Sequence, residues 1–143
     1  MKEPSEARQR TLELHDRAIA FSNNINHPAP RAPSTIRATL SGDNSCGPAT
    51  GTSNNLIEAG DGCTDADFLH RMRTALREAK ESKACLKKIR LGPPANAARV
   101  LEFGLEQEAD ELCAIYATIV LNVEKRLARE KAERRNGRVR DCN

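Results

Sequence analysis

The sequence feature that most constrains the fold is one amphipathic run between residues 66 and 90. Its apolar side chains recur every three or four residues, the spacing that places them on one face of an α-helix. Thr64 and Asp67 have the spacing of a capping box at a helix start, and Gly92 with the prolines after it is a stop signal. The pattern predicts a helix over residues 65–90. Its expected apolar seam consists of Phe68, Met72, Ala75, Ala79, Ser82, Leu86 and Ile89.

The amino-acid composition favours helices throughout the core. The 143 residues include no Trp, one Tyr and three Phe. The interior must therefore be built from Leu, Ile, Val and Ala, a set that suits helices better than sheets. A chain of this length can bury its own core without further domains. We expect an all-α fold in which residues 1–143 form a single domain.

Two further helices follow from the same periodicity, one over residues 5–24 and one over residues 95–135. The segment from Asn26 to Pro33 is too rich in proline for a helix and predicts a linker. Glycines and a proline between residues 41 and 51 favour a loop. Helical propensity alone therefore does not place a second helix there.

The last predicted helix is apolar on nearly all sides over residues 112–123. A helix on the surface of a bundle needs only one apolar stripe, so the additional apolar surface predicts burial between subunits. We expect an oligomer, and the alternative is a monomer with a broad core stripe. The predicted interface residues are Cys113, Ile115, Val120 and Leu121.

Charge is distributed in blocks, although the formal net charge is only +3. Residues 65–90 contain eight Lys or Arg against four acids, residues 91–123 one against five, and residues 124–143 eight against four. The last block is the best candidate for contact with phosphate groups. The alternative is a solvated helix end whose cations complement the helix dipole. The candidate nucleic-acid-binding residues are Lys125, Arg126, Arg129, Lys131, Arg134, Arg135, Arg138 and Arg140.

Five cysteines stand at positions 46, 63, 85, 113 and 142. Their number is odd, the gaps are wide, and no C-x-x-C pair or nearby histidine supports a zinc site. We expect all five thiols to be reduced. Cys85 and Cys113 are predicted to be small core residues, and Cys142 an exposed thiol in a polar tail.

Support for catalysis is weak. Asp67 and His70 have the i, i+3 spacing that can share a metal ion, but the other histidines, His15 and His27, are in no such motif. The sequence contains no recognisable glycine-rich phosphate loop, nucleophile elbow or Cys-His-acid arrangement. We expect a protein that is not an enzyme, with no catalytic residue, no metal and no cofactor.

Nothing in the sequence predicts a membrane protein. No apolar run reaches the roughly 18 residues that a spanning helix requires. The first six residues also lack the apolar region of a signal peptide. We therefore expect a cytoplasmic protein.

Three stretches together resemble one known family. The first is Gly51–Gly60, with the sequence GTSNNLIEAG, and the second is Asp67–Ala79, with the sequence DFLHRMRTALREA. Glu108–Leu112 followed by Ile115 matches a third pattern. The combination resembles the 23S rRNA intervening-sequence protein family, also called the four-helix bundle protein family. It is also similar to the accessory variability determinant proteins of diversity-generating retroelements, which bind nucleic acid and a reverse transcriptase.

The resemblance implies a bacterial up-down-up-down four-helix bundle that assembles into a ring, a homopentamer in the family. It also implies that residues 35–60 are helical despite their glycines. Asn55, Glu58 and Glu78 match signature positions, and we expect them to tie helices together by hydrogen bonds. Unlike family members, this chain lacks arginines over residues 44–49.

The function implied is that of an accessory factor contacting structured RNA or nucleoprotein through basic surfaces. The alternative is a scaffold for protein–protein interactions that binds no nucleic acid. An enzyme or a metal–carboxylate site is the third possibility. The class of fold therefore follows from the residues, while the function follows mainly from the resemblance.

Overall fold

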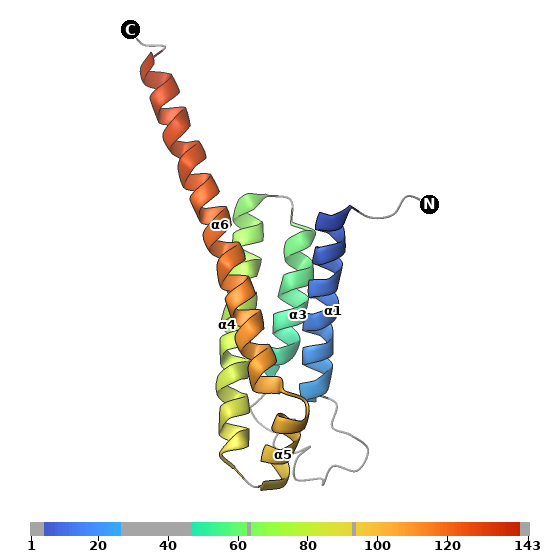
Figure 1. Ribbon diagram of the computed structural model, residues 1–143. Coiled ribbons are helices and arrows are strands. Elements are labelled where there is room, and N and C mark those ends of the chain that lie inside the picture. The colour runs from blue at the N-terminus through green and yellow to red at the C-terminus, as the bar shows by residue number, and fades with distance from the viewer. Residues whose placement is uncertain (1–4, 27–46, 63, 93, 141–143) are drawn as a thin grey trace.

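The described residues of the protein are all-α. The computed structural model describes residues 5–26, 47–62, 64–92 and 94–140, and these contain no strand. The helices are α1 (Glu6–Asn26), α3 (Gly47–Gly60), α4 (Asp65–Arg90), α5 (Pro94–Glu102) and α6 (Leu105–Arg140) (Figure 1). The all-α prediction is confirmed. Residues 35–46 of the predicted second helix lie outside the described residues.

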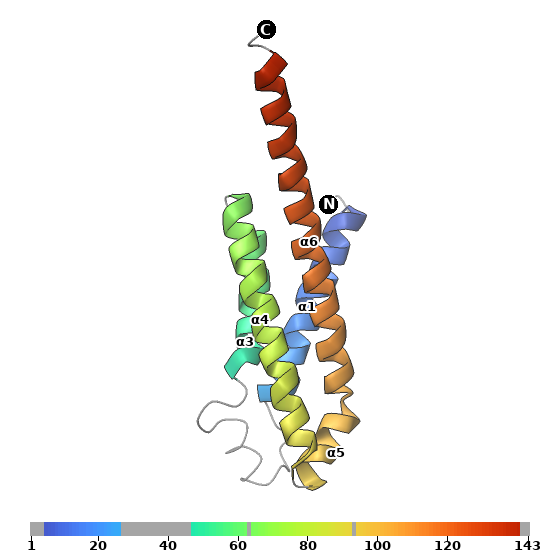
Figure 2. The ribbon, with the colours of Figure 1, turned by 90° about the vertical axis from the view of Figure 1, so that its left-hand side faces the viewer.

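Consecutive long helices run in opposite directions. In Figure 1, α1 descends from the N-terminal end, α3 ascends, α4 descends, and α6 ascends past the ends of the others. Helix α3 packs against α1 and α4, and α6 packs against α4 and α1. Figure 2 shows the short helix α5 at the lower end, where it contacts α4 and α6.

Helix α4 forms where the periodicity predicts it. The hydroxyl of Thr64 accepts a hydrogen bond from the backbone N–H of Asp67 at 3.1 Å and donates one to the Asp67 carboxylate at 2.6 Å. This N-cap satisfies one of the backbone donors that a helix start leaves unpaired. All predicted seam residues except Phe68 are buried, and Phe68 is half-buried against the core.

Small residues let α3 approach its neighbours closely. Pro48 lies in the first turn of α3, where its missing N–H has no helical partner to lose. A Cβ atom at Gly51 would lie 3.0 Å from Cδ of Glu78 on α4. The glycines of this segment therefore favour helix packing rather than the loop that propensity predicts.

The prediction of one helix over residues 95–135 is wrong, because the chain breaks between α5 and α6. Gly104 adopts a φ of 57°, the left-handed conformation that glycine tolerates best, and its N–H bonds to the Leu101 carbonyl at 3.1 Å. The turn allows α5 to fold across the end of α4 and to bury Val100. Helix α6 then runs through Gly137 to Arg140, beyond the predicted end at 135.

The core combines a few large side chains with many small ones. The largest fully buried side chains include Tyr116, Phe21, Ile25, Met72 and Leu86. The alanines 18, 49, 75, 79 and 109 are also fully buried. Small residues at these contacts bring the helix axes close, so the core needs few aromatic side chains.

Cys85 is disulfide-bonded, so the prediction that all five thiols are reduced is wrong. The other described cysteine, Cys113, is a free thiol. Cys85 is also buried, as predicted for a core residue, and Cys113 is half-buried. Sequence spacing cannot reveal such a bond, since disulfide formation depends on how close two residues lie in the fold.

Candidate nucleic-acid interface

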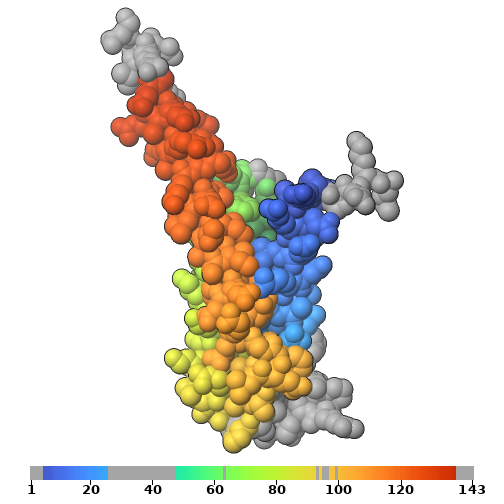
Figure 3. Space-filling model, in the orientation of Figure 1, coloured from blue at the N-terminus to red at the C-terminus, as the bar shows by residue number. Residues whose placement is uncertain are grey.

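The last part of α6 stands clear of the other helices. Leu127 still packs against the core, but from Ala128 to Gly137 every side chain except that of Glu130 is exposed. We call residues 128–140 the α6 projection. Figure 3 shows it extending away from the rest of the molecule. Its length is about 20 Å at 1.5 Å per helical residue.

The face of α6 that packs on the core becomes basic where the core ends. Val120 is buried, and Val123 and Leu127 follow it on the same face as partly buried residues. Lys131 and Arg134 lie four and seven residues beyond Leu127, so they continue this face in the α6 projection. A surface that is apolar inside the molecule therefore continues outside it as a row of cations.

The predicted phosphate-binding residues divide into two groups. Arg126 bonds to Asp65 of α4 at 2.6 Å and to Glu130 at 3.2 Å, and Arg129 lies 3.9 Å from Glu133. Four others are exposed and form no ion pair with any described residue. These four are Lys125, Lys131, Arg134 and Arg135.

Arg138 and Arg140 complete the predicted set. Both lie in the last turn of α6, but their side chains are outside the described part of the structure. The backbone of α6 therefore carries the whole predicted basic segment on one continuous helix. The four exposed, unpaired cations are the ones available to a phosphate group.

Three ion pairs join the basic block of α4 to acids of α6. The basic residues of α4 face the acidic residues of α6 along the antiparallel contact between the two helices. These pairs lie near the surface, so each adds little stability, but together they fix the register of α4 against α6. They are Arg90–Glu106 at 2.5 Å, Lys83–Asp110, and Arg73–Glu124 at 2.6 Å.

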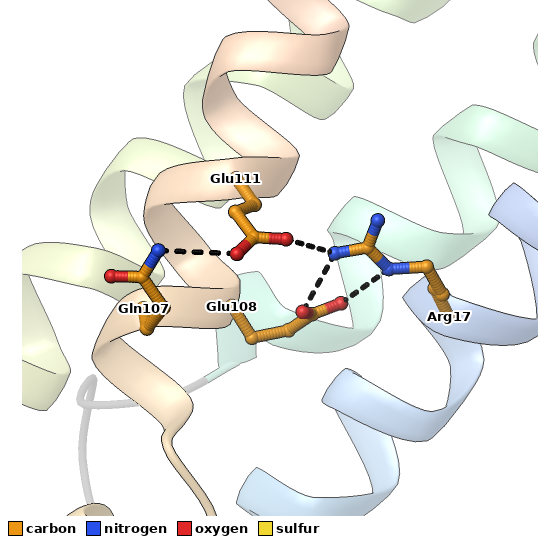
Figure 4. A network of polar contacts seen from close by, with 4 residues as sticks. All are labelled: Arg17, Gln107, Glu108 and Glu111. Carbon is orange, nitrogen blue, oxygen red and sulfur yellow. Dashed lines mark hydrogen bonds and ion pairs between the residues drawn. The ribbon is translucent and has the colours of Figure 1, made fainter.

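A second polar network joins α1 to α6 (Figure 4). Arg17 of α1 binds both oxygens of Glu108 at 2.9 and 2.7 Å and one oxygen of Glu111 at 2.7 Å. The hydrogen bonds to Glu108 are the main cause that raises the pKa of Arg17. Hydrogen bonds from Gln107 and then from Arg17 lower the pKa of Glu111. Four of the five acids of residues 91–123 thus have intramolecular ion-pair partners.

The three signature residues have local structural roles. The Asn55 amide donates to the Gly51 carbonyl of its own helix at 2.8 Å. Glu58 pairs with Arg71 of α4 at 2.5 Å. Glu78 packs against Gly51. Glu58 is thus ion-paired with the neighbouring helix, Glu78 packs against it, and Asn55 bonds within its own helix.

The predicted interface residues do not share one surface. Val120 is buried in the core, Cys113 and Ile115 are half-buried against it, and Leu121 is 52% exposed. Burial is the main cause that raises the pKa of the Cys113 thiol. Of these four residues, Leu121 has the most surface to offer a partner.

The buried hydroxyl of Tyr116 was not predicted from the sequence. Tyr116 is fully buried, and its hydroxyl has no hydrogen-bond partner within the described structure. Burial is the main cause that raises the pKa of this hydroxyl above its ordinary value. Glu108 and Arg17 also act on it electrostatically, so Tyr116 lies near the Arg17 network.

The described residues contain no group of three or more His, Cys, Asp or Glu that could hold a metal ion. Asp67 and His70 are both exposed, and Asp67 is bonded to Thr64. An open depression of about 470 Å³ between α4, α5 and α6 includes the ion-paired Arg90 and Glu106 in its lining.

Comparisons with known proteins do not assign the chain to a family. No family model, curated protein or solved structure matches it. Within the described ranges, none of the helices combines the length and apolarity needed to cross a bilayer. The chemistry of the exposed surfaces therefore carries the functional argument.

Proposed function

We propose that this protein is a non-catalytic, oligomeric four-helix bundle protein that contacts structured RNA or nucleoprotein through its basic surfaces. The bundle would consist of α1, α3, α4 and α6 in up-down-up-down order, as in the intervening-sequence protein family. The cyclic packing of α1 on α3, α3 on α4, α4 on α6 and α6 on α1 supports this architecture. A pentameric ring of bacterial origin is the form that the resemblance favours.

The observation that carries the RNA role is the contrast between paired and unpaired cations. Lys83 and Arg90 on α4 bind acids of α6, whereas Lys131, Arg134 and Arg135 are exposed without ion pairs to described residues. Exposed lysines of α4 such as Lys87 are also unpaired within the described ranges, but they lie on the packed part of the molecule and not on the α6 projection. Exposed cations on an extended helix suit the phosphates of a nucleic-acid backbone. The described part of the α6 projection contains no aromatic side chain on which a base could stack. We therefore expect binding with little base preference.

A ring would strengthen such binding, because several copies of the α6 projection would engage one RNA together. Each additional contact then occurs at a high effective concentration. This avidity lets a modest net charge per subunit support tight binding. The proposal thus couples the oligomer to the RNA role without requiring a large basic surface on each chain.

The proposed location is the cytoplasm, and the Cys85 disulfide is the observation against it, since cytosolic thiols are normally kept reduced. Trapping of thiols in intact cells with an alkylating reagent tests the location directly. Because Cys85 is buried, the protein is unfolded in acid before alkylation. An alkylated Cys85 would then support a reducing compartment, and a Cys85 that reacts only after chemical reduction would support an oxidising one.

The test of the RNA role is binding of a fluorescent RNA hairpin, measured by anisotropy over a salt series. The triple variant K131Q/R134Q/R135Q removes three exposed cations outside the core, so the fold should be unaffected. We expect a steep loss of affinity with salt for the native protein. The variant should have a log–log slope smaller by about 2 to 3 for each subunit engaged, at roughly 0.7 to 0.9 per phosphate contact.

The matched control is K87Q/K88Q, which removes two exposed lysines of α4 at the opposite end of the molecule. It should bind RNA as the native protein does. An equal loss in the control and the triple variant would indicate non-specific attraction. Absence of binding by the native protein at low salt would contradict the RNA role.

The second candidate function is a protein-interaction scaffold, and exposed apolar side chains favour it. Leu91, Leu101 and Phe103 are 70%, 66% and 44% exposed around α5. Large apolar side chains gathered at one end of a molecule are typical of a protein contact. A protein that binds no RNA but loses a protein partner when Leu101 is replaced by Asp would support this function.

A further inference from the structure

Two exposed apolar stripes lie on different faces of the molecule. The first is on α1, where Leu12 and Ile19 are 47% and 39% exposed. His15 lies between them in the helical register and approaches Gly60 of α3, at 3.9 Å from the position of a Gly60 Cβ atom. The stripe therefore follows the edge between α1 and α3, which we call face A.

The second stripe is on α6, where Leu121 is 52% exposed. Leu121 lies three residues before Glu124, which is paired with Arg73 of α4. On α4, Leu76 lies three residues after Arg73; it is half-buried and packs against the core, so the exposed apolar surface of this stripe is that of Leu121. These two leucines therefore follow the edge between α4 and α6, which we call face B. Since α1 and α3 form one pair of neighbours and α4 and α6 another, faces A and B lie on opposite sides.

The charges beside the two stripes are complementary. On face A, Glu13 and Asp16 are exposed and form no ion pair with any described residue, although Arg8 lies one turn before Leu12. On face B, Lys80 and Lys125 lie four residues after Leu76 and Leu121, and each is exposed and equally unpaired within the described ranges. Attraction between unlike charges would set the register of the two faces.

We infer that a second copy of this chain covers the apolar stripes, with face A of one subunit packed on face B of the next. A contact between two different faces is heterologous, and it generates a closed ring when its rotation closes. Because the faces run along the helices, subunits would stand side by side. Every α6 projection would then emerge at the same end of the ring.

This inference rests on the oligomer in the proposed function, and it names the faces that form its interface. It differs from the interface predicted from the sequence, because Val120 is buried in the core of its own chain and cannot reach a partner. It adds Leu12 and Ile19 of α1, which the sequence pattern of α6 could not indicate.

The test is the mass of the purified protein and two variants by light scattering over a concentration series. I19D should disrupt face A and L121D face B, and each variant alone should fall to the 15.7 kDa subunit mass. A 1:1 mixture should form a heterodimer of twice that mass, because the intact face A of L121D can bind the intact face B of I19D. A symmetric, isologous contact predicts no such heterodimer.

The control is R10D, which places a negative charge on a 79% exposed position of α1 two residues away from Leu12 and should leave the mass unchanged. If I19D fails to fold by circular dichroism, L12D tests the same face at a more exposed position. A native protein that is monomeric at every concentration, or an oligomer that survives both substitutions, would overturn the inference.

The RNA role fails or survives separately, because the mass is measured without RNA. A monomer that binds the RNA hairpin would remove the interface and leave the RNA role. A ring that binds no RNA would leave the interface and remove that role.

Discussion

Residues 105–127 and the α6 projection belong to the same helix but have different surroundings. In residues 105–127, Leu112 and Tyr116 are fully buried, and the acids at 106, 108 and 110 bind cations of α4 or α1. In the α6 projection, the corresponding face exposes Lys131 and Arg134 to solvent. One face of α6 thus packs against neighbouring helices along residues 105–127. In the α6 projection, where no described helix covers it, the same face carries cations that can bind a partner.

The largest expected difference between the two parts of α6 is in how much a substitution lowers the free energy of unfolding. Leu112→Ala should lower the free energy of unfolding by about 2 to 5 kcal/mol, because it removes a fully buried side chain and leaves a cavity. Arg134→Ala in the α6 projection should change it by less than about 0.5 kcal/mol. Urea unfolding followed by circular dichroism measures both, and similar losses would mean that the α6 projection is covered in solution.

The disulfide should stabilise the packed helices without affecting the α6 projection. Cys85→Ala should lower the free energy of unfolding by about 2 to 4 kcal/mol, the usual contribution of a native disulfide. RNA binding by the folded variant should be unchanged. Peptide mapping of the unreduced native protein would identify the partner cysteine, and alkylation of all five thiols before reduction would contradict the bond.

Tyr116, which lies in the packed part of α6, should make the stability of the fold sensitive to alkaline pH. The pKa of its hydroxyl is raised above the ordinary value of 10, so the unfolded chain loses this proton at a lower pH than the native protein. Stability should therefore fall as pH rises above 10, by up to about 1.4 kcal/mol per pH unit from this group.

Tyr116→Phe should remove this contribution and should cost little near pH 7, since the hydroxyl has no described partner to lose. The measurement is the difference in unfolding free energy between native protein and variant at pH 7 and at pH 11. A loss above about 1 kcal/mol at pH 7 would show that a bound water satisfies the hydroxyl.

The smallest expected effect concerns the contact between Arg17 and Glu108. A double-mutant cycle with Arg17→Ala and Glu108→Ala should give a coupling of about 0.5 to 1 kcal/mol, because the Arg17 side chain is 39% exposed and solvent screens the pair. Arg10 and Glu6, 79% and 92% exposed, provide a control pair with coupling close to zero. Equal couplings would mean that the bidentate geometry has no energetic consequence.

The sequence allowed α4 to be predicted to the residue, since its cap, seam and stop signal agree. It did not allow α5 and α6 to be separated, although Gly104 was a visible signal, because the apolar period continues on both sides of the turn. The predicted basic residues lie together on α6, and their role in binding stays a prediction. The sequence did not show which of these cations form ion pairs, because Arg126 pairs with Asp65, which is 61 residues away in the sequence.

The sequence by itself determined the helical class, the positions of α1 and α4 and the blocks of charge, because these depend on local spacing along the chain. Only the tertiary structure decided which charges remain available. Antiparallel packing places three cations of α4 beside acids of α6. In the α6 projection, Arg129 pairs with Glu133, while Lys131, Arg134 and Arg135 have no ion-pair partner among the described residues. Pairing between distant residues depends on how helices pack, and local spacing does not encode it.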